Sequence, residues 1–159
     1  MTLNPYGRQV KNVMSKIVVS ASSEDTVHEA LTLMHENQIS TLPVVDRHNR
    51  CIGIISASDL IALARELEQE ITDLGRVSDV SRQWLLEKLT EHDLGSQKLA
   101  TRMSSAVMSI APEAMLTSAA AEMLRHRIHH LPVIDGQGHL LGIISTMDLL
   151  TAFVEGVGQ

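Results

Sequence analysis

Apolar positions in the first half of the chain change between helical and strand-like spacing. A stripe spaced i, i+3, i+4 and i+7 predicts one buried helix face, formed by Val27, Ala30, Leu31 and Met34. Thr26 and Glu29 form the Thr-x-x-Glu pattern that is typical of a capping box at a helix start. The other expected elements are strands over 17–19, 42–46 and 51–55 and a helix over 59–74 that Gly75 would end.

The same order of elements recurs 89 residues further along the chain. Residues 14–60 align with 103–149 without a gap, and 18 of the 47 aligned positions are identical. The second copy predicts strands over 107–110, 131–135 and 140–144 and helices over 116–126 and 147–155. Each copy therefore has the order β-α-β-β-α. A repeat of this kind predicts an α/β (α+β) fold with two copies packed face to face.

The repeat divides the chain into four parts. We expect an N-terminal arm over 1–12, a first repeat over 13–65, a helical insertion over 66–100 and a second repeat over 101–159. The insertion carries an apolar stripe that includes Trp84, which favours a connecting helix covering exposed core. The alternative is a surface for a partner or for self-association, because tryptophan is enriched at interfaces.

Charge and cysteine content exclude several classes of function. The net charge of −6 and the pI of about 5.7 argue against nonspecific nucleic-acid binding, which needs a basic surface. No apolar run approaches the roughly 20 residues of a membrane helix, so no membrane partner is expected. A single cysteine, Cys51, and no secretory signal at the N-terminus favour a cytoplasmic location.

The sequence Gly-Ile-Ile-Ser-x-x-Asp, at 53–59 and again at 142–148, carries the candidate chemistry. An apolar strand ends at a hydroxyl and a helix begins, so the N–H groups of the first turn should point outward and attract a phosphate. The carboxylate three residues on has two acceptor oxygens and can accept both hydroxyls of a ribose. Each junction therefore predicts half of a nucleotide site.

An ordinary capping box is the alternative interpretation of Ser-x-x-Asp. Capping requires no glycine three residues before the serine, whereas the close approach of a ligand or of another backbone does. Two copies of the complete pattern, each beside Leu-Pro-Val-h-Asp (where h is Val or Ile), therefore favour a binding site.

The duplicated Leu-Pro-Val-h-Asp and Gly-Ile-Ile-Ser-x-x-Asp-Leu pattern resembles that of paired cystathionine-β-synthase (CBS) domains, often called a Bateman module. The resemblance covers about residues 13–154 apart from the central insertion. It implies two units packed through their sheets with pseudo-twofold symmetry and two clefts for adenosine derivatives such as AMP, ADP, ATP or S-adenosylmethionine. It also implies a regulatory ligand in place of a required cofactor, and a flat homodimer formed through the helices.

The resemblance further implies which residues line each cleft. In one cleft Ser145 and Asp148 would hold phosphate and ribose, with Ile143 beside the sugar and His130 at the phosphate. The adenine in that cleft would lie against Val18, Val19, Ile39 and Ser40. The second cleft would use Ser56, Asp59 and Ile54 with Val107, Met108, Ile128 and His129, and Thr41 takes the place of His130.

The difference between His130 and Thr41 predicts tighter binding of phosphorylated ligands in the Asp148 cleft. A charge-assisted contact is worth about 1.5–3 kcal/mol, or roughly tenfold and more in affinity. The histidine must be protonated for the full effect, so we expect the preference to weaken above neutral pH.

Three functional hypotheses follow. The first is a ligand-sensing regulatory module, and the second is an interaction or dimerisation scaffold whose clefts are vestigial; a protein target of unknown identity is compatible with both. An enzyme is disfavoured, because no nucleophile–base pair or cofactor loop is found. A metal site at His126, His129 and His130 is disfavoured too, because their rings need not converge.

Overall fold

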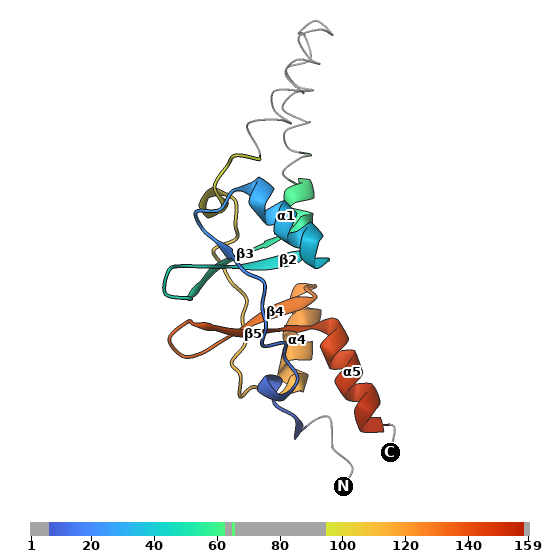
Figure 1. Cartoon of the computed structure of the whole chain (residues 1–159). Coiled ribbons are helices and arrows are strands. Elements are labelled where there is room, and N and C mark those ends of the chain that lie inside the picture. The colour runs from blue at the N-terminus through green and yellow to red at the C-terminus, as the bar shows by residue number, and fades with distance from the viewer. Residues whose placement is uncertain (1–6, 63–64, 66–94, 158–159) are drawn as a thin grey trace, which may run out of the picture. The chain divides into compact units, whose positions relative to one another are not determined.

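The computed structural model describes residues 7–62, 65 and 95–157 (Figure 1). The chain forms two compact units. The first-repeat unit comprises Val19–Val44 and Ile52–Ser105, and the second-repeat unit comprises Met1–Val18, Val45–Cys51 and Ala106–Gln159.

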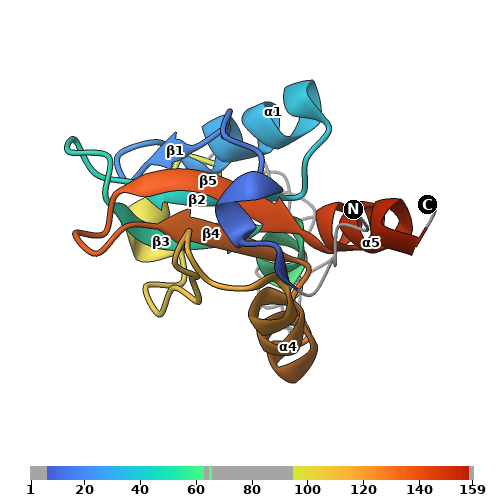
Figure 2. The same cartoon turned by 90° about the horizontal axis from the view of Figure 1, so that it is seen from below.

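The second-repeat unit is built on an antiparallel hairpin between two helices. Its elements are α4 (Leu116–His126), β4 (His130–Ile134), β5 (Leu140–Ser145) and α5 (Thr146–Val157). The strands pair from His130 opposite Ser145 to Val133 opposite Gly142, with a register shift after Val133. Figure 2 shows α5 running on from the end of β5, with α4 to one side of the hairpin. Near the edge of the sheet where β5 stops, α4 therefore ends and α5 begins.

The first-repeat unit has the same order of elements. They are β1 (Ala21–Ser22), α1 (Val27–Asn37), β2 (Thr41–Val45) and β3 (Cys51–Ser56), with the strands in the order β1-β2-β3. Residues 57–62 and 65 are helical and follow β3 directly. The predicted capping box begins α1, because Thr26 N–H donates to Glu29 Oε2 at 2.7 Å and Glu29 N–H donates to Thr26 Oγ1 at 3.2 Å.

The two hydrophobic cores correspond position by position along the repeat. Leu42 and Leu131, 89 residues apart, are both fully buried in equivalent strands. The same offset relates further buried pairs, which are Ala21 and Ile110, Val27 and Leu116, Ala30 and Ala119, Met34 and Met123, Val44 and Val133, Ile55 and Ile144, and Leu60 and Leu149. The repeated apolar pattern therefore encodes two equivalent cores.

The segment that leads each repeat packs in the unit of the other repeat. Val10 is fully buried in the second-repeat unit, where its N–H donates to the carbonyl of Ala114 at 2.8 Å. In the same way Leu99 is fully buried in the first-repeat unit, and its N–H donates to the carbonyl of Asp25 at 2.8 Å. Val10, in the predicted N-terminal arm, is thus part of a core.

The α/β fold class and most of the predicted elements are confirmed, but the first strand of each repeat is wrong. Residues 17–19 form no strand, and Ile17 is 94% exposed. In the second repeat only Ile110 pairs, through a single parallel bridge to Val133. A β-branched run with an exposed side chain gains little from pairing, because strand stability comes from a buried face.

The helix predicted to begin at Asp59 begins two residues earlier, at Ala57. Its remainder lies outside the described residues. So do Gly75 and most of the predicted insertion, including Trp84.

Candidate functional site

The Ser145–Asp148 corner lies where β5 ends and α5 begins. The N–H of Ser145 donates to Asp148 Oδ2 at 2.7 Å, and the Ser145 hydroxyl donates to the same oxygen at 2.8 Å. The N–H of Asp148 donates back to Ser145 Oγ at 3.2 Å. The serine and the carboxylate are therefore held together by three hydrogen bonds before any ligand is present.

The Ser56–Asp59 corner, at the end of β3, has the same geometry. Its corresponding distances are 2.7, 2.7 and 3.2 Å. Each corner is thus a complete capping box, which was the alternative interpretation of the motif. The N–H and the hydroxyl of the serine both donate to Oδ2 of the aspartate, so the Oδ1 atom takes no part in the box.

The N–H groups at these corners are less available than the sequence suggested. The N–H of Thr146 donates to the carbonyl of His129 at 2.9 Å, and the N–H of Ala57 donates to the carbonyl of Ser40 at 2.8 Å. The serine and aspartate N–H groups are engaged in the capping boxes. The expectation that the N–H groups of this turn point outward unpaired to receive a phosphate is therefore wrong for three residues of each corner.

His130 lies beside the Ser145–Asp148 corner, because it is the direct partner of Ser145 in the β4–β5 pair. Burial lowers the pKa of His130 below 6.5, and the nearby His129 lowers it further, while Asp148 opposes both effects. Burial therefore favours the neutral form of the imidazole. The charged phosphate contact expected from the sequence would need a proton that the folded protein disfavours.

The glycine of each motif makes room for protein atoms. A Cβ on Gly142 would lie 2.6 Å from Met14 Sδ and 2.8 Å from the carbonyl oxygen of Ser15. A Cβ on Gly53 would lie 2.3 Å from Met103 Sδ. The glycine of the motif thus allows a neighbouring segment of the protein, and not a ligand, to approach the strand closely. The identical Met-Ser pairs at 14–15 and 103–104 were the sequence signal for it.

Each predicted cleft draws its residues from both units. The first-repeat unit holds Val19, Ile39, Ser40, Thr41, Ile54, Ser56 and Asp59. The second-repeat unit holds Val18, Val107, Met108, Ile128, His129, His130, Ile143, Ser145 and Asp148. The structure brings each serine together with its aspartate inside one unit, and the pairing of the two halves of each cleft stays a prediction.

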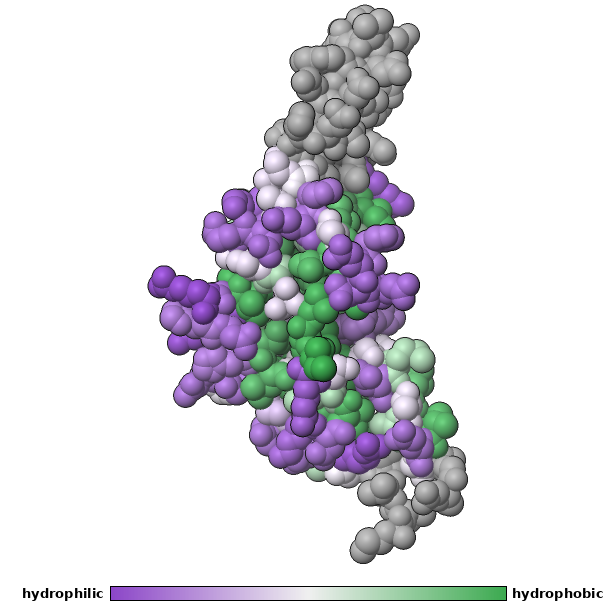
Figure 3. All heavy atoms as spheres, in the orientation of Figure 1, coloured by the Kyte–Doolittle hydropathy of each residue, from purple (hydrophilic) through white to green (hydrophobic). Residues whose placement is uncertain are grey.

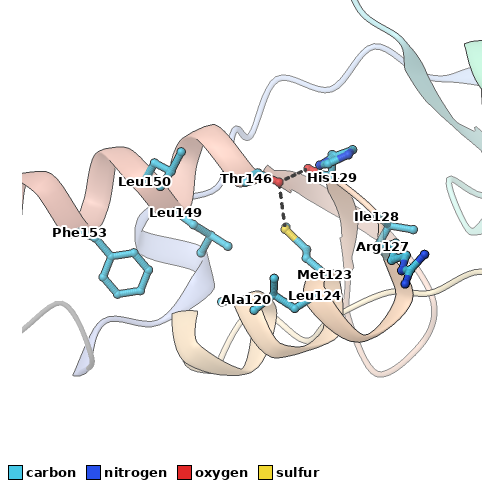
Figure 4. A pocket seen from close by; sticks show the side chains of 10 residues that line it. All are labelled: Ala120, Met123, Leu124, Arg127, Ile128, His129, Thr146, Leu149, Leu150 and Phe153. Atoms are coloured by element: carbon cyan, nitrogen blue, oxygen red, sulfur yellow. Dashed lines mark hydrogen bonds between the residues drawn. The ribbon is translucent and has the colours of Figure 1, made fainter.

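An apolar groove of about 420 Å³ lies between α4 and α5. Figure 4 shows Met123 and Leu124 of α4 and Leu149, Leu150 and Phe153 of α5 along it. The hydroxyl of Thr146 at one end donates to the carbonyl of His129 at 3.3 Å and lies 3.7 Å from Met123 Sδ. Leu124 is 80% exposed and Leu150 52% exposed, and Figure 3 shows hydrophobic atoms at the surface along α5.

The structure also bears on two other possibilities, a metal site and a membrane-spanning helix. His126 pairs with Glu122 at 3.3 Å on one face of α4. Within the described ranges 7–62, 65 and 95–157, no three His, Cys, Asp or Glu side chains gather as a metal site. None of the helices in that part of the chain has both the length and the apolar composition needed to cross a bilayer.

Comparison with known proteins identifies the repeat. The family model for the CBS domain matches residues 10–66 and 98–155. The uncharacterized protein MJ1426 of Methanocaldococcus jannaschii is 27% identical to this chain over 154 residues, which cover 91% of this chain and 90% of that protein.

Two similar solved structures were determined with adenosine compounds. The structure of CBSX2 in complex with AMP has a TM-score of 0.72 at 24% identity, covering 94% of this chain and 98% of that one. The CBS domain pair of MJ0100, in complex with 5-methylthioadenosine and S-adenosyl-L-methionine, has a TM-score of 0.67 at 21% identity and covers 92% and 96% of the two chains. At these identities the likeness shows the fold.

Proposed function

This chain belongs to the CBS domain family, and on that basis we propose that it is a non-catalytic regulatory module that binds an adenosine-containing nucleotide. The observation that carries the proposal is the repetition of one serine–aspartate corner in both units, with the same hydrogen bonds at each. Capping alone would need only one carboxylate oxygen per corner. The proposal gives the second oxygen, Oδ1, a role in binding the ribose hydroxyls.

The ligands of two structural neighbours support this choice of ligand. CBSX2 was determined with AMP, and the MJ0100 pair with 5-methylthioadenosine and S-adenosyl-L-methionine. Adenosine is the part that these compounds share. The proposed ligand class is therefore adenosine derivatives, including AMP, ADP, ATP and S-adenosylmethionine.

Each proposed cleft combines one corner with residues of the other repeat. In the first cleft, Asp148 binds the ribose, Ser145 and His130 face the phosphate, and Ile143 flanks the sugar. The adenine is assigned to Val18, Val19, Ile39 and Ser40. In the second cleft the same roles fall to Asp59, Ser56, Thr41 and Ile54, and the base is assigned to Val107, Met108, Ile128 and His129.

The ligand would act by favouring one arrangement of the protein over another, because a ligand shifts a conformational equilibrium only if it binds one state more tightly. We further propose that the protein works in the cytoplasm as a homodimer. The groove between α4 and α5 supports dimerisation through helices, since its Leu124 and Leu150 are largely exposed. Ile61, which corresponds to Leu150 in the first repeat, is 56% exposed.

A scaffold with vestigial clefts is the second candidate. The observation that favours it is the capping box itself, because capping accounts for the hydrogen bonds at both corners without any ligand. An experiment must therefore separate loss of a helix cap from loss of a binding site.

The chain contains a matched control for this purpose in the Thr26–Glu29 box. This box has nearly the same distances as the two corners, and neither of its residues belongs to a proposed cleft. Thermal melts should be measured with AMP, ADP, ATP and S-adenosylmethionine for the wild type and for Asp148→Ala, Asp59→Ala, the double variant and Glu29→Ala.

Ligand at 100 times its Kd should stabilise the wild type by about 2.7 kcal/mol, which is roughly 5–10 °C for a chain of this size. All the alanine variants should melt lower without ligand, because each loses the first-turn carboxylate of its capping box, which is worth about 0.3–1 kcal/mol at a helix N-terminus. Glu29→Ala should keep the full ligand shift, and the double aspartate variant should lose it. A double variant that keeps the shift would show that the aspartates do not bind the ligand, and a wild type that responds to none of the four compounds would favour the scaffold.

A further inference from the structure

We propose that Gly142 is a positioning residue for the adenosine site, because it holds the segment 14–18 in register against β5. This inference rests on the proposed function, since it assigns to Gly142 the placement of two residues, Val18 and Ile143, that the proposal puts in contact with the ligand.

The contact at Gly142 involves backbone. A Cβ there would lie 2.8 Å from the carbonyl oxygen of Ser15, 2.6 Å from Met14 Sδ and 3.1 Å from Met14 Cγ. Contacts below 3.0 Å require one of the groups to move. Rotation of a methionine can relieve the contacts to its side chain, but the carbonyl of Ser15 moves only if the backbone of the segment moves.

That carbonyl takes part in the hydrogen bonds that join the segment to β5. The N–H of Ile143 donates to the Ser15 carbonyl at 3.0 Å, and the N–H of Ser15 donates to the Ile143 carbonyl at 2.9 Å. These two bonds form an isolated antiparallel bridge. No neighbouring rung of a ladder helps to keep the register at this bridge, so a displaced Ser15 carbonyl weakens the attachment of the segment to β5.

Both ends of this bridge lead directly to the proposed ligand contacts. Ile143 is itself assigned to the sugar and lies two residues before Ser145. Ser15 lies three residues before Val18, where the chain leaves the second-repeat unit. A shift at the bridge therefore moves the base contact and the sugar contact relative to each other.

Gly53 provides an internal comparison, because its surroundings differ in one respect. The bridge beside it is equivalent, with Ile54 and Ser104 exchanging hydrogen bonds of 3.1 and 3.0 Å. The three atoms nearest to a Cβ on Gly53 all belong to the Met103 side chain, at 2.3, 2.9 and 3.2 Å. Shortening Met103 should therefore make room for an alanine at 53, whereas shortening Met14 should not do so at 142.

The test combines these substitutions and measures AMP binding at each corner separately. AMP affinity is measured by calorimetry in the Asp59→Ala background for the Ser145–Asp148 corner, and in the Asp148→Ala background for the other. Gly142→Ala should weaken AMP binding at its corner about tenfold, the equivalent of one or two lost hydrogen bonds. Adding Met14→Ala should not restore it. Gly53→Ala should weaken the other corner, and adding Met103→Ala should restore binding to that of Met103→Ala alone.

Hydrogen exchange without ligand provides the second readout. The amides of Ser15 and Ile143 should exchange faster in Gly142→Ala, and those of Ser104 and Ile54 should not change. If Gly142→Ala does not fold, Ser15→Pro, which removes one donor of the bridge, should give the same selective loss of AMP binding.

Three results would overturn the inference. One is normal AMP binding by Gly142→Ala, and another is full rescue by Met14→Ala, which would reduce the contact to a side-chain clash. The third is equal loss at both corners, which would indicate general damage to the fold. If both parent backgrounds bind no adenosine compound, the proposed function fails and the positioning role fails with it. If they bind AMP and Gly142→Ala does too, only the positioning role fails.

Discussion

His130 and Ser145 are direct partners across the antiparallel β4–β5 pair, so their side chains lie on the same face at the end of the hairpin. Asp148 is hydrogen-bonded to that serine and is close enough to raise the pKa of the histidine, but burial and His129 outweigh it. An imidazole, a hydroxyl and a carboxylate thus meet at one corner, and in the first repeat Thr41 stands in place of the histidine.

The pKa of His130 predicts a pH-dependent preference for phosphorylated ligands. Because this pKa lies below 6.5, the imidazole gains its charge only as the pH falls below that value, and a bound phosphate favours the charged form. The ratio of AMP to adenosine affinity in the Asp59→Ala background should therefore rise between pH 7.5 and 5.5, by about tenfold for a charge-assisted contact. Calorimetry at four pH values measures the ratio.

His130→Gln is the control for this experiment, because the phosphate of AMP titrates in the same range. The variant should keep only the change that comes from the ligand. Identical pH profiles for the variant and the parent would show that His130 does not contact the phosphate. Without ligand, the lowered pKa predicts that the contribution of His130 to stability is present above 6.5 and is lost as the pH falls through its folded value.

The turn carboxylates predict a loss of stability in acid. The N–H of Arg50, and after it that of His48, lowers the pKa of Asp46 from 3.8, and the N–H and ring of His139 do so for Asp135. Their contribution to stability is present above about 3.8 and is lost as the pH falls through the lower folded values. Asp46→Asn and Asp135→Asn should flatten the fall of Tm between about pH 4 and 2. A double variant with the wild-type slope would contradict this assignment.

The groove between α4 and α5 predicts a surface variant that changes only the oligomeric state. Leu150→Glu places a charge in an apolar groove that a second copy would bury, so the proposed dimer should dissociate. Sedimentation velocity at several concentrations measures the effect. Thr151→Glu, on the same helix but outside the groove lining, should remain dimeric. A wild type that is monomeric at every concentration would disprove the homodimer.

The correspondence of the two cores predicts equal sensitivity at equivalent positions. Leu42 and Leu131 are both fully buried, each as the second residue of its strand and the first of the same Leu-Pro-Val sequence. Replacing either leucine with alanine should cost about 2–5 kcal/mol of unfolding free energy, because each leaves a cavity in a packed core. Denaturant titration of both variants checks this, and a large difference between them would show that the cores are not packed alike.

Elements with a strong apolar period could be predicted from the sequence. The expected helix over 116–126 coincides with α4, and the strands of both hairpins lie within one residue of their predicted ends. The run at 17–19 has the composition of a strand, but its Ile17 is 94% exposed and the run pairs with no strand, so composition alone was misleading there. The sequence could not predict whether the segment before each repeat packs in the unit of its own repeat or in that of the other repeat. The internal alignment is the same in both cases.

The two serine–aspartate corners were predictable from the sequence but their hydrogen bonding was not, and the assignment of residues to clefts stays a prediction. Two copies of the motif located both corners. The engagement of Oδ2 in a cap and the lowered pKa of His130 depend on packing distances and burial, which the pattern does not contain. The role of the glycines was recognised as close approach, and only the structure identified Met14, Ser15 and Met103 as the groups that approach.

The exchange of leading segments has an evolutionary consequence. A single ancestral repeat would have lacked the residues equivalent to Val10 and Leu99 in its own core unless a second molecule donated them. The simplest precursor is therefore a pair of identical short chains with swapped ends, which gene duplication later fused. Each half could then diverge, as His130 and Thr41 have done, without losing the mutual dependence that keeps the halves together.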